Sequence, residues 1–160
     1  MNTTQLNSVI TKGELLDHWQ GHRRLTRRLI EAFPEKEFFN YSIGGMRTAA
    51  EMMMELIAIT GPGIVEIATG KTNQLVESFE HGNKKQVFLD KWDEQTEIVN
   101  RNWDKITEER FHEKIKSFGE YEGTVHSTIF YFIDNEIHHR GQCYVYLRGL
   151  GIEPPFFPQR

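Results

Sequence analysis

The sequence has 160 residues, of which 19 are basic and 23 acidic, giving a formal net charge of −4. A chain of this length fits one domain, residues 1–160, which buries roughly 70% of the surface that the unfolded chain exposes. The acidic balance argues against direct nucleic-acid binding, because phosphate contacts need a basic surface. The single cysteine excludes an internal disulfide, so the fold does not depend on an oxidising compartment. We find no signal-peptide pattern and expect no membrane span, and so predict a cytoplasmic protein.

Hydrophobic periodicity predicts four long helices, at residues 14–33, 46–59, 84–106 and 124–150. Pro34 is expected to end the first, and the Gly-Pro-Gly run at 61–63 the second. The fourth helix repeats small or apolar residues at every fourth position. Four amphipathic helices in one domain predict an all-α four-helix bundle.

Two connections carry weaker signals. The segment 63–83 contains Gly70 and Gly82, and we expect a lid or crossover of short helical pieces between the second and third helices. The segment 107–123 is polar, and we expect it to lead directly into the fourth helix. No internal repeat or low-complexity segment interrupts the domain.

The stretch DNEIHHRGQ, residues 134–142, lies in the fourth helix and holds two adjacent histidines. Successive residues differ by about 100° around a helix, so each histidine is paired with the residue four positions earlier. His138 pairs with Asp134, and a solvated ion pair is the expected result. His139 pairs with Asn135 on a side that also carries Thr128 and Tyr146. If this side faces the interior, it is either a candidate site or a plain core histidine with satisfied hydrogen bonds.

Several segments resemble the DinB/YfiT-like superfamily of four-helix proteins. They are HWQGHRRLTRRLIEAFPEKEFFNYSIGGMRT in the first helix and its loop, RTAAEMMMELIAI in the second helix, and EIHHRGQCYVYLRGLGIEPP at the end of the fourth. The order and spacing of these segments carry the resemblance. It implies the four-helix fold and a metal ion held by a histidine on the second helix and an H-x-x-x-H pair on the fourth.

Carried over to this sequence, the ligand positions hold Glu55, Asn135 and His139. Glu55 stands where the resemblance places the second-helix histidine, and Asn135 replaces the first histidine of the pair. A carboxylate is a competent ligand for zinc, nickel, iron or manganese, whereas an amide oxygen is a weak one. We therefore predict an altered site for one divalent metal ion. The alternative is a metal-free core in which Glu55 pairs with His139 and Asn135 completes the hydrogen bonds.

Other residues with ligand chemistry have ordinary interpretations. His18 and His22 lie four positions apart on the first helix and could supply a ligand, but neighbouring arginines indicate a partly exposed face. Met52, Met53 and Met54 are read as core filler or the wall of an apolar pocket. Cys143 is read as a buried, inert thiol.

Two classes of function follow. The resemblance implies a metal-dependent hydrolase or thiol S-transferase, with Glu55 and His139 as metal ligands or, without metal, as an acid–base pair. The alternative is a non-catalytic dimeric binding or stress-response protein that has lost the metal. The resemblance also implies a homodimer, and Gly141 and Gly149 indicate a close contact with a helix or a second subunit. A small-molecule ligand is possible, although no nucleotide or phosphate motif identifies it.

Overall fold

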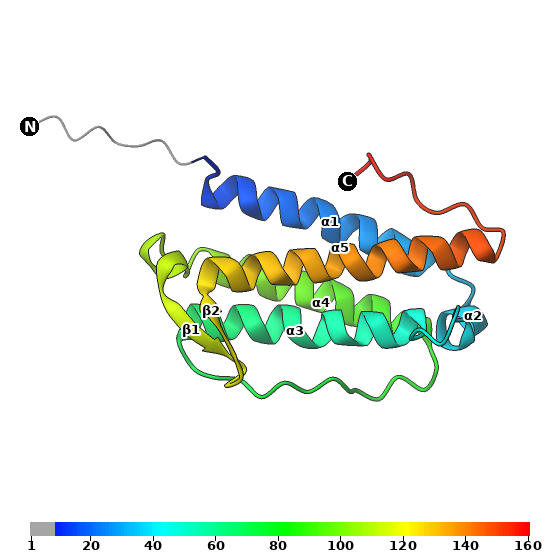
Figure 1. Cartoon of the computed structure of the whole chain (residues 1–160), viewed down its shortest axis with the longest axis horizontal. Coiled ribbons are helices and arrows are strands. Elements are labelled where there is room, and N and C mark those ends of the chain that lie inside the picture. The colour runs from blue at the N-terminus through cyan, green and yellow to red at the C-terminus, as the bar shows by residue number, and fades with distance from the viewer. Residues whose placement is uncertain (1–8) are drawn as a thin grey trace, which may run out of the picture.

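The computed structural model describes residues 9–160 as a bundle of four long helices with short elements at its two ends. The long helices are α1 (Lys12–Ala32), α3 (Ala49–Thr69), α4 (Lys85–Trp103) and α5 (Val125–Gly149) (Figure 1). The short elements are α2 (Glu35–Asn40), the 3₁₀ turn η1 (Glu109–His112), and the antiparallel strands β1 (Lys114–Ser117) and β2 (Tyr121–Thr124). The prediction of an all-α four-helix bundle is confirmed.

Three of the four predicted helices, α1, α4 and α5, match their expected bounds within a few residues, and side-chain caps explain where α1 and α5 start. The Thr11 hydroxyl accepts a hydrogen bond from the backbone N–H of Glu14, whose carboxylate binds back to Thr11. Thr124 caps the start of α5 through the backbone N–H of Ser127. Each cap satisfies amide groups that have no partner inside the helix.

The predicted end of the second helix at residues 61–63 is wrong. Helix α3 continues through Pro62 and ends at Thr69, where Gly70 caps it with a positive φ of 71°. Both glycines of the Gly-Pro-Gly run serve close packing. Gly61 faces the side chain of Gln95 on α4, and a Cβ on Gly63 would lie 2.5 Å from Cζ of Phe132 on α5. Tertiary contact therefore outweighs the weak helix propensity of these three residues.

The connection between α3 and α4 also differs from its prediction. Residues 63–69 belong to α3, and the remainder, the connecting segment 70–84, contains no helix or strand. Figure 1 shows this segment running beside α3, so the crossover exists without its expected helical pieces. The polar connection before α5 contains a β-hairpin, which hydrophobic periodicity did not indicate because the strands are only four residues long.

Helix α3 is the most apolar helix of the bundle. Among residues 9–160 it alone is long and apolar enough to cross a membrane, with a mean hydropathy of 1.4, a match that the sequence prediction did not foresee. In the structure 67% of that window is buried against the other helices. A helix that is apolar on most sides is expected at the centre of a bundle.

A buried polar network joins α1 to α5. Glu136 accepts hydrogen bonds from the Thr26 hydroxyl at 2.6 Å and from the Trp19 indole N–H at 3.3 Å. Arg23 and Arg140 each place a guanidinium nitrogen 3.8 Å from its carboxylate. Burial raises the pKa of Glu136, and the two guanidinium groups oppose that rise.

His22 extends this network toward the surface. Arg140 donates a hydrogen bond from Nη2 to Nδ1 of His22 at 2.8 Å. Nε2 of His22 lies 3.2 Å from Nη1 of Arg160 and 3.2 Å from Nε2 of His18. Both ring nitrogens of His22 are therefore engaged by neighbouring groups, and the two histidines do not present two free lone pairs to a metal ion.

The first prediction concerns the close packing at Gly63. We expect Gly63→Ala to destabilise the protein by about 1–3 kcal/mol, because the new methyl group meets the buried ring of Phe132. Urea denaturation measures the change. Gly13→Ala is the control, since a Cβ there has no atom within 4 Å, and its stability should be unchanged or slightly higher. Equal stability of the two variants would contradict the packing role of Gly63.

The second prediction concerns pH. Burial and the charge of Arg140 lower the pKa of His22 from 6.5 to about 3. Between pH 3 and pH 6.5 the unfolded chain binds more protons at His22 than the folded chain does. The contribution of His22 to the free energy of unfolding is therefore complete above pH 6.5 and is lost as the pH falls toward 3. We expect a loss of about 2 kcal/mol between pH 7 and pH 5 from this residue. His22→Gln, which keeps an acceptor for Arg140, should reduce the pH dependence of unfolding, whereas the exposed control His138→Gln should not. Identical pH profiles for His22→Gln and wild type would refute the assignment.

Candidate functional site

The bundle brings together the three side chains at the predicted ligand positions. Glu55 lies in the second turn of α3, and Asn135 and His139 occupy successive turns of α5 on the face that packs against α3. Nδ2 of Asn135 donates a hydrogen bond to Oε1 of Glu55 at 2.8 Å. Nε2 of His139 lies 3.3 Å from Oε2 of the same carboxylate. The spacing of four residues therefore places both α5 side chains on one carboxylate.

A fourth residue, Arg47, completes this group, which we call the polar cluster. Its Nη1 lies 2.6 Å from Oε2 of Glu55, and its Nη2 lies 3.2 Å from Nε2 of His139. The backbone is fixed nearby, because the hydroxyl of Tyr146 donates to the carbonyl of Arg47 at 2.8 Å. Arg47 is part of the quoted motif RTAAE, but residue patterns alone gave it no role.

The hydrogen bonds favour one tautomer of the neutral His139 ring. Its Nδ1 lies 2.8 Å from Oε1 of Gln142, so Nδ1 carries the proton and donates it to that carbonyl oxygen. Nε2 then holds a lone pair, which accepts a hydrogen bond from the guanidinium of Arg47. The imidazole of His139 and the carboxylate of Glu55 thus both accept hydrogen bonds from the guanidinium group of Arg47.

Glu55 is ionised in this arrangement. Burial alone would raise its pKa, but the hydrogen bonds from Asn135 and Arg47 offset burial and hold the pKa of Glu55 below its usual value. Its side chain keeps 16% of its surface exposed. The carboxylate is therefore a charged group that a neighbouring molecule can still reach.

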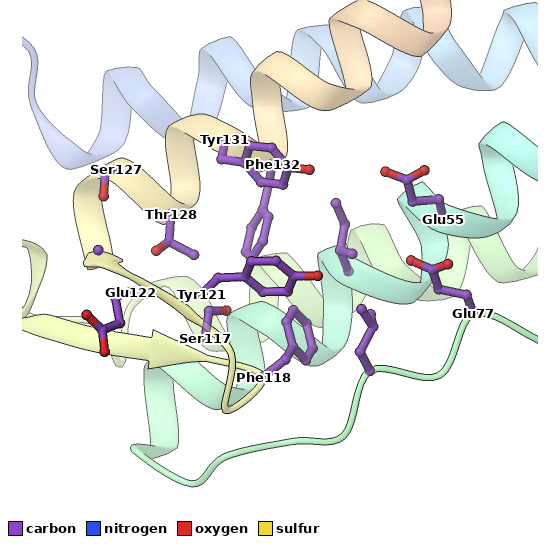
Figure 2. Close-up of a pocket in the computed structure, with 13 residues that line it drawn as sticks. Glu55, Glu77, Ser117, Phe118, Tyr121, Glu122, Ser127, Thr128, Tyr131 and Phe132 are labelled. Atoms are coloured by element: carbon purple, nitrogen blue, oxygen red, sulfur yellow. The ribbon is translucent and has the colours of Figure 1, made fainter.

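A cavity of about 440 Å³ opens beside Glu55, within the size range of small-molecule sites. Figure 2 shows aromatic rings grouped along it, with the carboxylates of Glu55 and Glu77 together at one end. The thirteen lining residues come from α3, the connecting segment, the hairpin and α5: Glu55, Ile59, Leu75, Glu77, Ser117, Phe118, Tyr121, Glu122, Gly123, Ser127, Thr128, Tyr131 and Phe132. A second hollow of about 490 Å³ shares Glu55 and Glu77 and is also lined by Arg47.

Glu66, buried near the end of α3, holds two walls of the cavity in place. Its carboxylate accepts hydrogen bonds from the backbone N–H of Phe118 in the hairpin at 2.9 Å and of Asn73 in the connecting segment at 2.7 Å. Phe118 has a positive φ of 52°, a conformation that costs a non-glycine residue roughly 1–2 kcal/mol. The bond to Glu66 stabilises this conformation, and the ring of Phe118 lines the cavity.

The other candidates from the sequence lie outside the polar cluster. Asp134 and His138 are exposed, and within residues 9–160 no ion pair joins them, so the expected solvated pair is not formed. Cys143 is buried, and burial raises its pKa to about 12, which makes it the inert thiol that was predicted. Met52 and Met53 are core residues, as predicted, and Met54 lines the second hollow.

The comparisons with known proteins agree with this fold. Residues 1–159 match the family model described as the DinB family. The chain belongs to the DinB family. Two crystal structures of DinB-like proteins superpose with a TM-score of 0.69 each. The protein from Bacillus cereus ATCC 10987 is 15% identical, over 90% of this chain and 95% of its own. The protein from Bacillus subtilis is 21% identical, over 91% of this chain and 99% of its own. No curated protein matches the chain.

The donor groups of this DinB-family member do not fit a metal ion as they are arranged. Asn135 turns its amide N–H₂ toward Glu55, and Arg47 occupies the position between Glu55 and His139 where a cation would bind both. Within residues 9–160, no three side chains of the types His, Cys, Asp and Glu form a metal-binding group. Metal binding by Glu55, Asn135 and His139 therefore stays a prediction from the family resemblance.

Proposed function

We propose that this DinB-family protein is a small-molecule-binding protein whose site works without a resident metal ion. The observation that carries the proposal is the position of Arg47, whose guanidinium contacts both the carboxylate of Glu55 and the imidazole of His139. Arg47 supplies a fixed positive charge where the family resemblance implies a metal cation. The adjoining cavity provides the space and the apolar walls that a small ligand needs.

The chemistry of the polar cluster supports binding more than catalysis. Metal-dependent hydrolysis or thiol transfer needs an ion with open coordination positions for water or thiolate, and the guanidinium group of Arg47 has no coordination positions. Acid–base chemistry by His139 requires a free Nε2, and that atom accepts a hydrogen bond from Arg47. The same contacts hold Glu55 charged and oriented, as a recognition group at the end of the cavity requires.

The third prediction tests the metal-free site. We expect protein purified without a metal-affinity tag to contain less than stoichiometric zinc, nickel, iron or manganese by elemental analysis. Arg47→Ala should bind Zn²⁺ or Ni²⁺ at least about tenfold more tightly than wild type, because it frees Glu55 and His139. Arg101→Ala, which removes an exposed arginine on α4, is the control. One equivalent of metal in the wild type that is lost in Glu55→Gln would overturn the proposal.

The second part of the proposal is a homodimer, as the family resemblance implies, formed through the outward face of α5. Ile137, Gly141 and Val145 follow one another at four-residue steps on this face, and all three are exposed. A Cβ on Gly141 would meet no described atom within 4 Å, so no other described segment covers that position. An exposed apolar stripe along a helix is suited to the same stripe of a second copy.

The fourth prediction tests this dimer. We expect Val145→Glu to convert a dimer to a monomer in light-scattering measurements after size-exclusion chromatography, because a carboxylate placed in an apolar contact is costly to bury. Val76→Glu is the matched control, since Val145 and Val76 are 57% and 56% exposed and Val76 lies on the connecting segment. A monomeric wild type, or a dimeric Val145→Glu variant, would rule out this contact.

A further inference from the structure

The cavity beside Glu55 has a marked charge bias. Its thirteen lining residues include three carboxylates, Glu55, Glu77 and Glu122, and no lysine, arginine or histidine. Glu55 is paired with Arg47, which lines the neighbouring hollow. Within residues 9–160, the carboxylates of Glu77 and Glu122 make neither a hydrogen bond nor an ion pair, although Lys116 stands opposite Glu122 in the hairpin. No direct partner therefore neutralises these two carboxylates.

Aromatic rings form much of the wall between these carboxylates. Tyr121 and Tyr131 are 59% and 56% exposed at the opening, and Phe118 and Phe132 lie deeper and are buried. Figure 2 shows the hydroxyl groups of both tyrosines on the side of Glu55 and Glu77. An aromatic face attracts a cation through its negative quadrupole, and nearby carboxylates strengthen that attraction.

The negative charges at the cavity also affect the pKa of Tyr131. Burial raises the pKa of its hydroxyl, and the charges of Glu55 and Glu77 raise it further. The charge of Arg47 acts in the opposite direction but does not cancel this rise. The opening of the cavity thus disfavours an added negative charge and favours a positive one.

An independent feature inside the cavity indicates a ligand. The hydroxyl of Ser117 is buried, with the residue 3% exposed, and it has no hydrogen-bond partner among the described residues. Figure 2 shows its oxygen on the side of the Tyr121 and Phe118 rings, away from Glu55 and Glu77. A buried hydroxyl without a partner costs roughly 1–3 kcal/mol, and a polar group on a bound molecule would remove that cost.

The walls are also held in place before any ligand binds. Glu66 fixes the backbone of Phe118 in its positive-φ conformation, and Gly63 leaves room for Phe132 to pack close to α3. Each of these two features places an aromatic ring at the cavity, and neither contacts the polar cluster. A site that is formed in advance loses less entropy when its ligand binds.

We propose that this cavity binds an organic cation, namely an amine or quaternary ammonium group attached to a flat apolar body. The cationic group lies between Glu77 and Glu55, the body packs against Phe118 and Phe132, and a polar group at its far end meets Ser117. This inference rests on the proposed small-molecule binding and adds the charge class of the ligand.

The fifth prediction uses three indole probes that share one apolar body and differ in charge: tryptamine, the neutral alcohol tryptophol, and indole-3-propionate. We expect isothermal titration calorimetry to show that tryptamine binds at least about tenfold more tightly than tryptophol, and that indole-3-propionate binds more weakly than either. Glu77→Gln should reduce the preference for tryptamine about three- to tenfold and leave tryptophol binding unchanged. Glu80→Gln is the control, because Glu80 is exposed on the same segment and does not line the cavity.

The outcomes separate this inference from the proposed function. Binding of all three probes with equal affinity, or a preference for indole-3-propionate, overturns the cation inference while the binding function stands. A preference for tryptamine that Glu77→Gln does not reduce also overturns it, because the cation then binds elsewhere. Failure of every probe to bind at millimolar concentration overturns the inference and the binding function together.

Discussion

The close approach of α3 to its neighbours at Gly61 and Gly63 is the constraint on which the rest of the structure depends. Without side chains at these positions, α3 can pass Gln95 and Phe132 and continue to Thr69. Its last turn then carries Glu66 to the hairpin and to the connecting segment, and both become walls of the cavity. Earlier on the same helix, Glu55 faces Asn135 and His139 of α5, so the polar cluster adjoins the cavity.

The two polar groups of the bundle differ in how their charges are balanced. Around Glu136, two guanidinium groups and two neutral donors surround one carboxylate in a closed interior, where Nη1 of Arg23 lies near the carboxylate but has no hydrogen-bond partner. Around Glu55, one guanidinium and one amide leave part of the carboxylate exposed. The first group has the properties of a structural network between α1 and α5, and the second those of a recognition site.

The sequence predicted the bundle well because its signals are local and repeated. The periodic apolar positions located α1, α4 and α5, and the four-residue spacing placed Asn135 and His139 on one face. It failed at residues 61–63, where glycine and proline ordinarily stop a helix but here allow contacts that only the folded chain reveals. The role of Arg47 was missed for a related reason, since a loop residue reaches His139, 92 positions later, only through tertiary structure. The hairpin and the connecting segment, which complete the cavity, carry no periodic signal.

The connecting segment 70–84 forms part of the cavity wall without being part of the helical framework. It contributes Leu75 and Glu77 to the cavity, yet it contains no helix or strand. Near its start it is fastened by Asn73, whose backbone and side chain bind Glu66 and the carbonyl of Pro62. Beyond that point Leu75 and Phe79 pack against the core, whereas Glu77 is exposed at the cavity. In evolutionary terms, relatives with the same bundle can acquire different ligands by changing the exposed positions of this segment, with little loss of folding stability.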